Sequence, residues 1–274
     1  MALPITYLFV PGNRPDRFDK ALASGADAVI LDLEDAVEAG AKDNARAAVG
    51  AWLAENRPGD GRLLVRINDE TTDWFEDDLD LLRGAGFIGV MLPKAESAGQ
   101  IARVVAALDP GVIVVPLIET ALGLRDVASI AAADGVQRLA FGTLDFAVDL
   151  DLSGDERGLI APAMTIAVAS RCAGKAAPIA GVTPAINDDD ALVRDLAFAR
   201  AVGFTAKLCI HPVQVTAVRR ALAPSATELD WARRVIAAAA ASSGVVQVDG
   251  RMVDRPVLLK ARAILDRASF PSSN

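Results

Sequence analysis

Glu119 and Asp145 are the two residues whose type and position best fit a metal site. They follow the short apolar runs Val112–Ile118 and Arg138–Phe141, which have the length and composition of buried strands. Two carboxylates at adjacent strand ends, completed by water and substrate oxygens, suit the octahedral coordination of Mg²⁺. No cysteine cluster or nearby histidine accompanies them in the sequence, which disfavours zinc. In the alternative interpretation, each carboxylate caps the helix that follows it.

A second set of charged residues lies where two other apolar runs end. Asp32, Glu34 and Asp35 either bind the metal through its waters or orient a nearby cation. Arg66 ends its run, and its guanidinium can hold a carboxylate or a developing enolate oxygen with two hydrogen bonds. The alternatives are an ion pair between Arg66 and Glu34 or Asp35, and a helix cap at Asp35.

Three further basic residues and one histidine have open roles. Lys94 either neutralises an anionic substrate or pairs with the acidic cluster, and the sequence shows no sign of the apolar burial that a Schiff-base lysine needs. Arg14 and Lys20 can hold phosphates near a helix N-terminus, or else lie on a solvated helix face. His211 is the only histidine and stays unassigned.

These residues require a scaffold that brings many strand ends together. Short apolar runs alternate along the chain with longer alanine-rich segments, and most runs are continuously apolar, as expected for parallel strands that are covered on both faces. Eight strand-then-helix units favour a closed (β/α)8 TIM barrel over an open sheet, with the active site at the carboxyl ends of the strands. The predicted strands are Ile5–Val10, Ala28–Leu33, Leu63–Ile67, Ile88–Leu92, Val112–Ile118, Arg138–Phe141, Pro178–Gly181 and Ala206–Ile210.

The predicted helices follow these strands in order. The last fifty or so residues depart from the alternation and predict two helices that flank a short hairpin, with a frayed tail. We therefore expect a catalytic barrel over residues 1–223 and a lid or oligomerisation extension over 224–274. The predicted helices of the barrel are Arg14–Ser24, Ala41–Asn56, Thr72–Gly84, Ser97–Leu108, Ala121–Ala132, Gly158–Ala173, Asp188–Val202 and Pro212–Ala223. The extension has Glu228–Ser243, Val245–Val248, Met252–Val253, Arg255–Ala268 and the tail Ser269–Asn274.

Bulk composition narrows the class of partner. The chain has 274 residues, of which 52% are hydrophobic, and a formal net charge of −8. This charge argues against broad binding of nucleic acid or of an anionic membrane. We expect no signal peptide, because Pro4, Pro11 and Gly12 interrupt the first apolar stretch, and the sequence contains no apolar stretch long enough to span a bilayer. Two cysteines, Cys172 and Cys209, without a framework of pairs fit a reducing compartment, so the expected location is the cytoplasm.

An ordered set of short strings resembles the citrate lyase beta-subunit-like (CitE-like) CoA-ester lyases of the HpcH/HpaI aldolase and malyl-CoA lyase superfamily. Each string alone is weakly specific, but the set runs in order across nearly the whole chain. The strings are Phe9–Arg14, Asp32–Val37, Val65–Asn68, Leu92–Lys94, Pro116–Thr120, Gly142–Phe146 and Lys207–Pro212.

The resemblance implies a (β/α)8 barrel that binds Mg²⁺ through the residues matching Glu119 and Asp145. Arg66 matches an arginine that contacts substrate, and Glu119 borders the same substrate. The positions that contact CoA in malyl-CoA lyase-like members match Phe9, Arg14 and Lys20.

The string Asp249–Pro256 resembles the lid of the longer family members. There the aspartate matching Asp254 enters a neighbouring subunit's site and acts as the acid/base, and such members are commonly trimers or hexamers. The alternative role of Asp254 is a helix cap, because Arg255 and Pro256 open a helical run.

The function that the resemblance implies is Mg²⁺-dependent cleavage or formation of a 3-hydroxyacyl-CoA thioester such as malyl-, citramalyl- or citryl-CoA. Cleavage would give a 2-oxo acid and an acyl-CoA. Arg66 and Asp254 would be catalytic, assisted by Glu34 and Asp35. Three alternatives stay open: a citrate lyase beta subunit that acts on a citryl group bound to an acyl carrier protein, a CoA-independent class II pyruvate aldolase, and a non-catalytic barrel subunit.

Overall fold

The computed structural model of the protein describes residues 3–56, 62–86, 89–241 and 246–268. The described residues fall into two compact units, one spanning Leu3–Arg219 and the other beginning at Arg220. That residues 1–223 form a catalytic domain and residues 224–274 a lid or oligomerisation extension stays a prediction.

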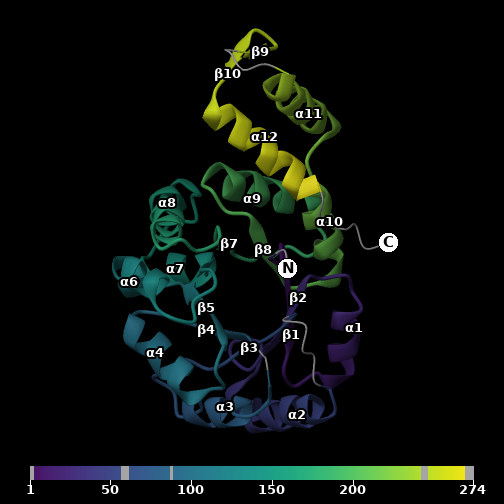
Figure 1. Ribbon diagram of the computed structural model, residues 1–274. Coiled ribbons are helices and arrows are strands. Elements are labelled where there is room, and N and C mark those ends of the chain that lie inside the picture. The colour runs from purple at the N-terminus through teal and green to yellow at the C-terminus, as the bar shows by residue number, and fades with distance from the viewer. Residues whose placement is uncertain (1–2, 57–61, 87–88, 242–245, 269–274) are drawn as a thin grey trace. The chain divides into compact units, whose positions relative to one another are not determined.

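Eight parallel strands close into a barrel in chain order, so that β1 pairs with both β2 and β8. In Figure 1 the helices of this unit surround the strands. The predicted (β/α)8 fold is confirmed, and the predicted strands are present with described ends shifted by no more than two residues. The predicted start of the fourth strand, Ile88, lies outside the described residues. The strands are β1 (Thr6–Pro11), β2 (Ala28–Asp32), β3 (Leu63–Arg66), β4 (Gly89–Leu92), β5 (Ile113–Ile118), β6 (Ala140–Phe141), β7 (Ile179–Ala180) and β8 (Ala206–Cys209).

The barrel is filled by side chains from alternate strand residues. Tyr7, Ile30 and Leu64 belong to the cluster that fills the interior. The intervening residues, such as Val29 and Leu31, are fully buried as well. Because successive strand side chains point to opposite faces, burial of both sets means that the strands are covered inside and outside. This double burial explains why the strands are continuously apolar in sequence rather than alternating.

Helices connect the strands, with three differences from the sequence-based expectation. The predicted helix Arg14–Ser24 is a short 3-10 helix, Pro15–Arg17, followed by the five-residue helix α1 (Phe18–Leu22). The predicted helix Ala121–Ala132 is wrong as a single element, because Asp126 leaves helical geometry with φ −100° and ψ 9° and separates two short helices. A seven-residue helix after β6 was not predicted, since it is too short to show apolar periodicity. The helices are α1 (Phe18–Leu22), α2 (Lys42–Glu55), α3 (Phe75–Leu82), α4 (Ala98–Ala107), α5 (Ala121–Arg125), α6 (Val127–Ala132), α7 (Thr143–Asp149), α8 (Arg157–Cys172), α9 (Asp189–Ala201) and α10 (Pro212–Leu222).

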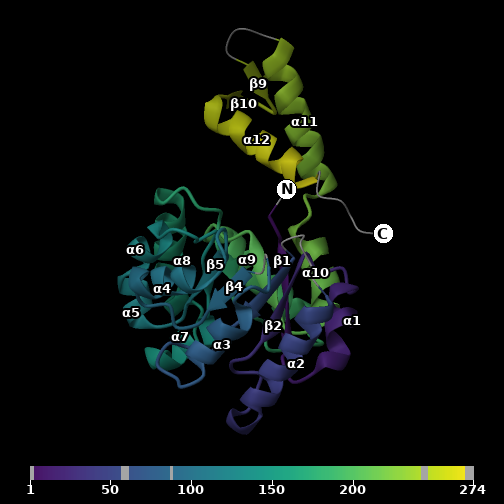
Figure 2. The same cartoon turned by 60° about the horizontal axis from the view of Figure 1, so that its bottom comes forward.

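The second unit is a helical hairpin with a small β-ribbon. Helices α11 (Ala226–Ala241) and α12 (Arg255–Ala268) run side by side, and the antiparallel strands β9 (Val246–Val248) and β10 (Arg251–Val253) form the ribbon between them in sequence (Figure 2). The core of this unit comprises Ala232, Val235, Ala261 and Ile264.

The predicted hairpin is confirmed over its described residues. Asp249 and Gly250 both have positive φ, 51° and 73°, which is the geometry that a two-residue type I′ turn requires. Three predicted segments lie partly or wholly outside the described residues: the last two residues of the predicted helix Glu228–Ser243, the first residue of the predicted hairpin, Val245, and the predicted tail Ser269–Asn274. Within the described part of the chain, we find no helix with the length and apolarity that crossing a bilayer demands.

Candidate functional site

A cavity of about 350 Å³ lies at the carboxyl ends of the barrel strands. Strand ends on one side supply charged side chains to its lining, among them Asp32, Arg66 and Glu119. Strands β7, β8 and the loops that follow them supply apolar ones, including Val182 and Ile210. The position of the cavity is the one expected for an active site on this fold.

Arg66 lies at the centre of the charged side of the cavity. Asp32, its partner in the register of β2 and β3, accepts hydrogen bonds from Nε at 2.7 Å and from Nη2 at 2.6 Å. Nη1 lies 2.8 Å from Glu34 Oε2 and 3.5 Å from Asp35 Oδ2. The ring of Phe9 lies beneath the guanidinium, with 4.7 Å between Cζ and the ring centroid. This bidentate grip fixes the plane of the guanidinium at the cavity wall.

The predicted ion pair between Arg66 and the acidic cluster is therefore present, and Asp32 is its strongest partner. Burial alone would lower the pKa of Arg66, but the charges of Asp32, Glu34 and Asp35 outweigh burial and raise it. The pKa of Glu34 is raised, first by burial and then by the charges of Asp35 and Asp32, while Arg66 opposes this. The predicted cap at Asp35 is wrong, since no described helix begins there.

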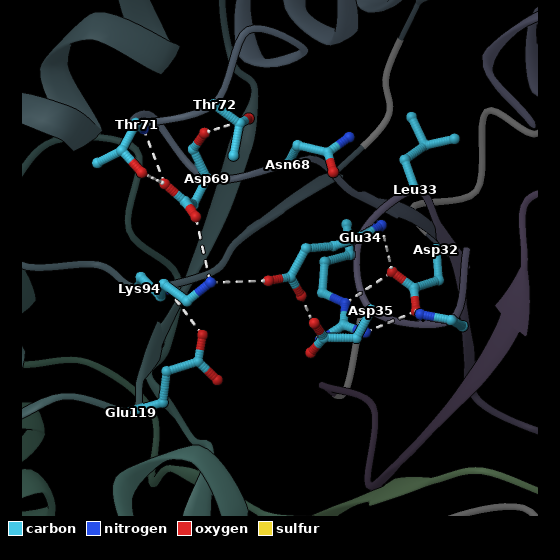
Figure 3. A network of polar contacts seen from close by, with 12 residues as sticks. Asp32, Leu33, Glu34, Asp35, Asn68, Asp69, Thr71, Thr72, Lys94 and Glu119 are labelled. Carbon is cyan, nitrogen blue, oxygen red and sulfur yellow. Dashed lines mark hydrogen bonds and ion pairs between the residues drawn. The ribbon is translucent and has the colours of Figure 1, made fainter. Parts of the chain in front are cut away.

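Lys94, which follows β4, donates hydrogen bonds to residues that follow three other strands. Its Nζ donates to Asp69 Oδ2 at 3.1 Å and to Glu34 Oε1 at 3.4 Å, and its backbone N–H donates to Glu119 Oε1 at 2.8 Å (Figure 3). Burial would lower the pKa of the ammonium group, but its hydrogen bond to Asp69 and the charge of Glu34 raise it. Of the two predicted roles, pairing with the acidic cluster is what the structure shows, and Lys94 stays protonated.

The backbone at Lys94 is left-handed, with φ of 43°. A residue with a Cβ atom adopts this conformation at a cost, so a left-handed lysine is held in place by its surroundings. The conformation occurs where the chain leaves β4 and where the Lys94 N–H reaches the carboxylate of Glu119. The turn therefore positions Glu119.

Glu119 is 2% exposed and has little room to move. A Cβ atom at Gly142 would lie 2.6 Å from its Cβ, so this side chain needs glycine beside it. Burial raises the pKa of Glu119 to about 8; the hydrogen bond from the Lys94 N–H lowers it, and the charges of Glu34 and Asp145 raise it further. A buried carboxyl group with other carboxylates around it is stabilised by any cation that binds there.

Asp145 lies in the first turn of α7 and lines the same cavity as Glu119. The predicted alternative of helix capping fails for both residues, because Thr120 is the N-cap of α5 and Gly142 that of α7. The described residues contain no group of three metal-ligating side chains. Two carboxylates leave the remaining positions of an octahedral ion to water and substrate oxygens, which is the usual mode for Mg²⁺.

Carboxyl groups outnumber cations around this end of the barrel, which fits a site that binds a divalent cation. The carboxyl groups are Asp32, Glu34, Asp35, Asp69, Glu119 and Asp145, and the cations are Lys42, Arg66 and Lys94.

The predicted CoA residues are only partly brought together. Phe9 lines the cavity. Arg14 is half-exposed and forms an ion pair with Asp16 at 2.9 Å, and Lys20 is exposed on α1. Neither basic residue lines the cavity, so a nucleotide contact by either would lie on the rim outside it.

Asp254 and His211 each stabilise a helix end. Asp254 Oδ1 accepts from the Val257 backbone N–H at 3.0 Å, which makes the aspartate the cap of α12 in the second unit. His211 is exposed, and its Nδ1 accepts from the Val213 N–H at 3.3 Å at the start of α10. Capping by Asp254 is compatible with a second role.

Sequence reasoning missed two polar residues of the site. Asp69 is held by the Thr71 backbone N–H and hydroxyl and pairs with Lys94; its position three residues after Arg66 was the available signal. Lys42 is buried and donates from Nζ to the carbonyls of Leu33 and Glu34, at 2.8 and 2.7 Å. Lys42 is one lysine within a predicted helix, and nothing in the sequence marked it as a residue of the site.

Residues 6–212 match the family described as HpcH/HpaI aldolase/citrate lyase. The chain belongs to this family. A second family model, the C–C bond lyase of the TIM-barrel fold, matches residues 163–271. The resemblance inferred from the ordered strings is thereby confirmed.

The relatives that this HpcH/HpaI family chain matches are named for different activities. A citrate lyase subunit beta-like protein of Mycobacterium tuberculosis is 40% identical, over 97% of this chain and 96% of the relative. A (3S)-malyl-CoA thioesterase of Cereibacter sphaeroides is 33% identical, over 96% of this chain and 94% of the relative. The crystal structure of CitE from M. tuberculosis in complex with magnesium, acetoacetate and coenzyme A matches with a TM-score of 0.85 and 39% identity, over 97% of this chain and 98% of that one.

In the absence of divalent cations, we expect stability to fall as pH rises through neutrality. Glu119 has a folded pKa of about 8 against 4.5 ordinarily, so the folded state retains a proton that the unfolded chain has released. Over that interval the free energy of unfolding decreases with pH. Glu119→Gln should flatten the decrease in melting temperature measured in EDTA from pH 5 to 8.5, at roughly 2–4 °C per kcal/mol. The surface variant Asp16→Asn is the control, and its melting temperature should fall with pH as steeply as that of the wild type. If the melting temperature of Glu119→Gln falls as steeply too, the raised pKa does not belong to Glu119.

Lys94→Gly and Lys94→Ala separate the ammonium group from the backbone turn. Both variants lose the ion pairs to Glu34 and Asp69 and should melt below the wild type. Glycine accepts a left-handed backbone and alanine does not, so the alanine variant should be less stable than the glycine variant by about 1 kcal/mol. Thermal unfolding of both measures the difference. Equal melting temperatures would show that the turn is not strained.

Proposed function

We propose that the protein is a Mg²⁺-dependent carbon–carbon lyase that cleaves, or forms, a 3-hydroxyacyl-CoA thioester to give a 2-oxo acid and an acyl-CoA. The observation that carries the proposal is the pairing of Glu119 and Asp145 at one cavity with a fixed arginine, Arg66. The relative of known structure that binds magnesium, acetoacetate and coenzyme A supports the choice of metal and of thioester.

Glu119 and Asp145 would hold the metal. Glu119 is buried and Asp145 is exposed, and neither forms an ion pair within the described part of the chain, so both offer the oxygen donors that Mg²⁺ prefers. When bound, the ion makes the substrate hydroxyl more acidic and neutralises negative charge that develops on oxygen. Lys94 keeps Glu119 in place through its backbone N–H.

Arg66 stabilises the enolate oxygen of the leaving acyl group. Its guanidinium is fixed by Asp32 before substrate arrives, so no reorganisation is needed when charge develops. Glu34 and Asp35 act on the reaction through the position of Arg66 and of Lys94. The hydroxyl proton leaves as the carbon–carbon bond breaks.

Asp254 is the proposed acid/base that gives a proton to the enolate carbon, or removes it in the condensing direction. We assign it to the cavity of a neighbouring subunit, in a homo-oligomer that is a trimer or a hexamer. Phe9, Arg14 and Lys20 are the proposed contacts of CoA; Phe9 lines the cavity, and Arg14 has a charge partner of its own in Asp16. Two free cysteines fit a cytoplasmic protein.

A panel of malyl-, citramalyl- and citryl-CoA, each with Mg²⁺ and with EDTA, tests the proposal. Lyase action releases a 2-oxo acid and an acyl-CoA, whereas a thioesterase like the Cereibacter relative would release free CoA and the hydroxy acid. Measuring all four product classes separates the two. Activity only with a citryl group on an acyl carrier protein would instead indicate a citrate lyase beta subunit, and activity on CoA-free substrates an aldolase. Products that do not depend on Mg²⁺ would overturn the metal assignment.

Glu119→Gln should lower kcat/KM by about 100-fold or more, because glutamine keeps the size of the side chain but removes the charge that holds the metal. The variant should remain folded, since Glu119 is protonated in much of the metal-free protein. Steady-state kinetics with circular dichroism as the folding control measure both. A Glu119→Gln protein with full Mg²⁺-dependent activity contradicts the proposed site.

Asp254→Asn and Asp254→Ala distinguish catalysis from capping. Asparagine caps a helix about as well as aspartate, whereas alanine costs roughly 1 kcal/mol. If Asp254 is the acid/base, both variants lose activity, and only the alanine variant loses hydrogen-exchange protection in the first turn of α12. Co-expressing Asp254→Asn with Glu119→Gln should restore about a quarter of the sites in a shared assembly. If the Asp254→Asn protein is active, Asp254 is not the acid/base, and helix capping is its only remaining role.

A further inference from the structure

Lys207 is a buried cation on the outer face of the barrel that the proposed mechanism does not use. Its neighbours on β8, Ala206 and Leu208, belong to the cluster that fills the barrel interior, so the side chain of Lys207 points to the opposite face. The residue is 2% exposed, and its Nζ donates to the carbonyl of Gly181, directly after β7. A lysine is seldom buried unless its ammonium group is paired. This contact holds the first residue of the loop after β7, residues 181–185.

Gln214 joins this loop to the loop after β8. It is buried in the first turn of α10. Its Nε2 donates to the carbonyls of Thr183 and Ala185, at 2.9 and 3.4 Å, and its Oε1 accepts from the Ile210 backbone N–H at 2.9 Å. A primary amide donates and accepts at once, so one buried side chain fixes the spacing between two loops. These contacts are to backbone groups, so the side chains at Val182 and Ile210 can vary without breaking them.

Packing alone does not hold the loop after β7, because a cavity of about 80 Å³ lies behind it. Gly181 lines this cavity, as does Phe198 of α9. Lys207 and Asp195 line it too, with 3.6 Å between the ammonium nitrogen and the carboxylate, and the Thr183 hydroxyl donates to Asp195. Atoms beside a void have no packing partners on that side, so polar contacts decide where the loop lies.

The loop after β7 packs in turn against the start of α7. A Cβ atom at Gly181 would lie 2.6 Å from Thr143 Oγ1 and 2.8 Å from the Phe141 carbonyl oxygen, so only glycine allows this approach. Asp145 lies two residues after Thr143. It is exposed, and its side chain makes no hydrogen bond or ion pair with the rest of the described chain. The backbone of α7 therefore sets the position of Asp145.

We propose that Lys207 and Gln214 are positioning residues of the metal site. They hold the loop after β7 against Thr143, and this contact fixes where α7 presents Asp145 to the ion. The inference rests on the proposed metal ligands, Glu119 and Asp145. Neither Lys207 nor Gln214 is among the described residues that line the cavity at the strand ends, so each acts through the loop and touches neither metal nor substrate.

Binding of Mn²⁺ measures this role without turnover. Mn²⁺ shares the preference of Mg²⁺ for oxygen ligands in octahedral geometry, and electron paramagnetic resonance counts the free ion. In Lys207→Met and in Gln214→Glu we expect the dissociation constant for Mn²⁺ to rise about tenfold, the lower end of the effect of residues that orient metal ligands. Charge alone predicts the opposite sign, since losing an ammonium group or gaining a carboxylate near the site strengthens cation binding. Weaker binding therefore reports a displaced Asp145.

Lys175→Met is the matched control. The Nζ of Lys175 also donates to a carbonyl, that of Ala133 at 3.5 Å, but Lys175 precedes β7 and so lies at the end of the barrel opposite the strand-end cavity. This variant loses the same charge and should bind Mn²⁺ at least as tightly as the wild type. Circular dichroism and melting temperatures establish that each variant is folded at the temperature of the titration.

Gly181→Ala tests the contact with α7 directly and serves where a polar variant does not fold. It keeps Lys207 and Gln214 but forces the loop away from Thr143, so Mn²⁺ binding should again weaken by about tenfold. Adding Thr143→Ala removes the closer of the two contacts and should restore part of the affinity.

Asp145→Asn separates failure of the inference from failure of the metal assignment. It should weaken Mn²⁺ binding by at least about tenfold, because it removes the charge of one of two ligands. If it binds Mn²⁺ as the wild type does, Asp145 is not a ligand, and the metal assignment and the inference both fail. If it binds weakly while the folded Lys207, Gln214 and Gly181 variants bind as tightly as the wild type or more tightly, the metal site stands and the positioning role is overturned.

Discussion

The ion pair between Arg66 and Asp32 is the interaction on which the site depends. The two residues are neighbours in the register of β2 and β3, so barrel closure itself brings them together. Asp32 also accepts the backbone N–H groups of Glu34 and Ala36, at 2.9 and 3.2 Å, and thereby shapes the loop after β2. Lys42 holds the same loop by its carbonyls. A buried, bidentate pair has one geometry, and that rigidity is what an arginine needs to stabilise charge at a defined point.

The same strand ends impose an electrostatic constraint. Eight parallel strands direct their carboxyl ends to one rim, and here that rim holds more carboxyl groups than cations, so some of these groups are held at raised pKa. The fold accepts this unfavourable arrangement where a cation and an anionic substrate are to be bound, which is the usual relation between stability and function at an active site. Lys94 shows the constraint at one residue: its backbone is strained, its side chain neutralises Glu34 and Asp69, and its N–H orients Glu119.

Strand positions and site residues differ in how far the sequence determines them. Continuous apolar runs predicted the eight strands because both faces of a parallel sheet are buried, and charged residues at the ends of those runs predicted Arg66, Glu119 and Asp145 at one rim. The sequence did not predict α7 or the break at Asp126, because short helices are set by local backbone geometry and have no periodicity to detect. Nor did it show that Asp32 is the main partner of Arg66, since three acids in four positions are equivalent until the register of β2 and β3 is known. The role of Lys42 could not be predicted for a related reason. It depends on burial against the loop after β2, and no pattern of residue spacing in the sequence indicates that burial.

Charged residues follow β2 to β6 and apolar residues follow β7 and β8, so substitutions in these two parts of the cavity are expected to have different effects. The proposed metal ligands and Arg66 lie on β2 to β6 and the turns after them. The ion pairs of Arg66 and Lys94 link several residues of these strands, so a substitution at one is felt at the others. Val182 and Ile210 lie on the other side and take no part in that network. Substitutions there alter which group fits beside the reacting carbon without disturbing the buried charges. A family with one barrel and several thioester substrates is therefore expected to vary most at the ends of β7 and β8, and the chemistry that its members share is expected to reside on the strands between β2 and β6.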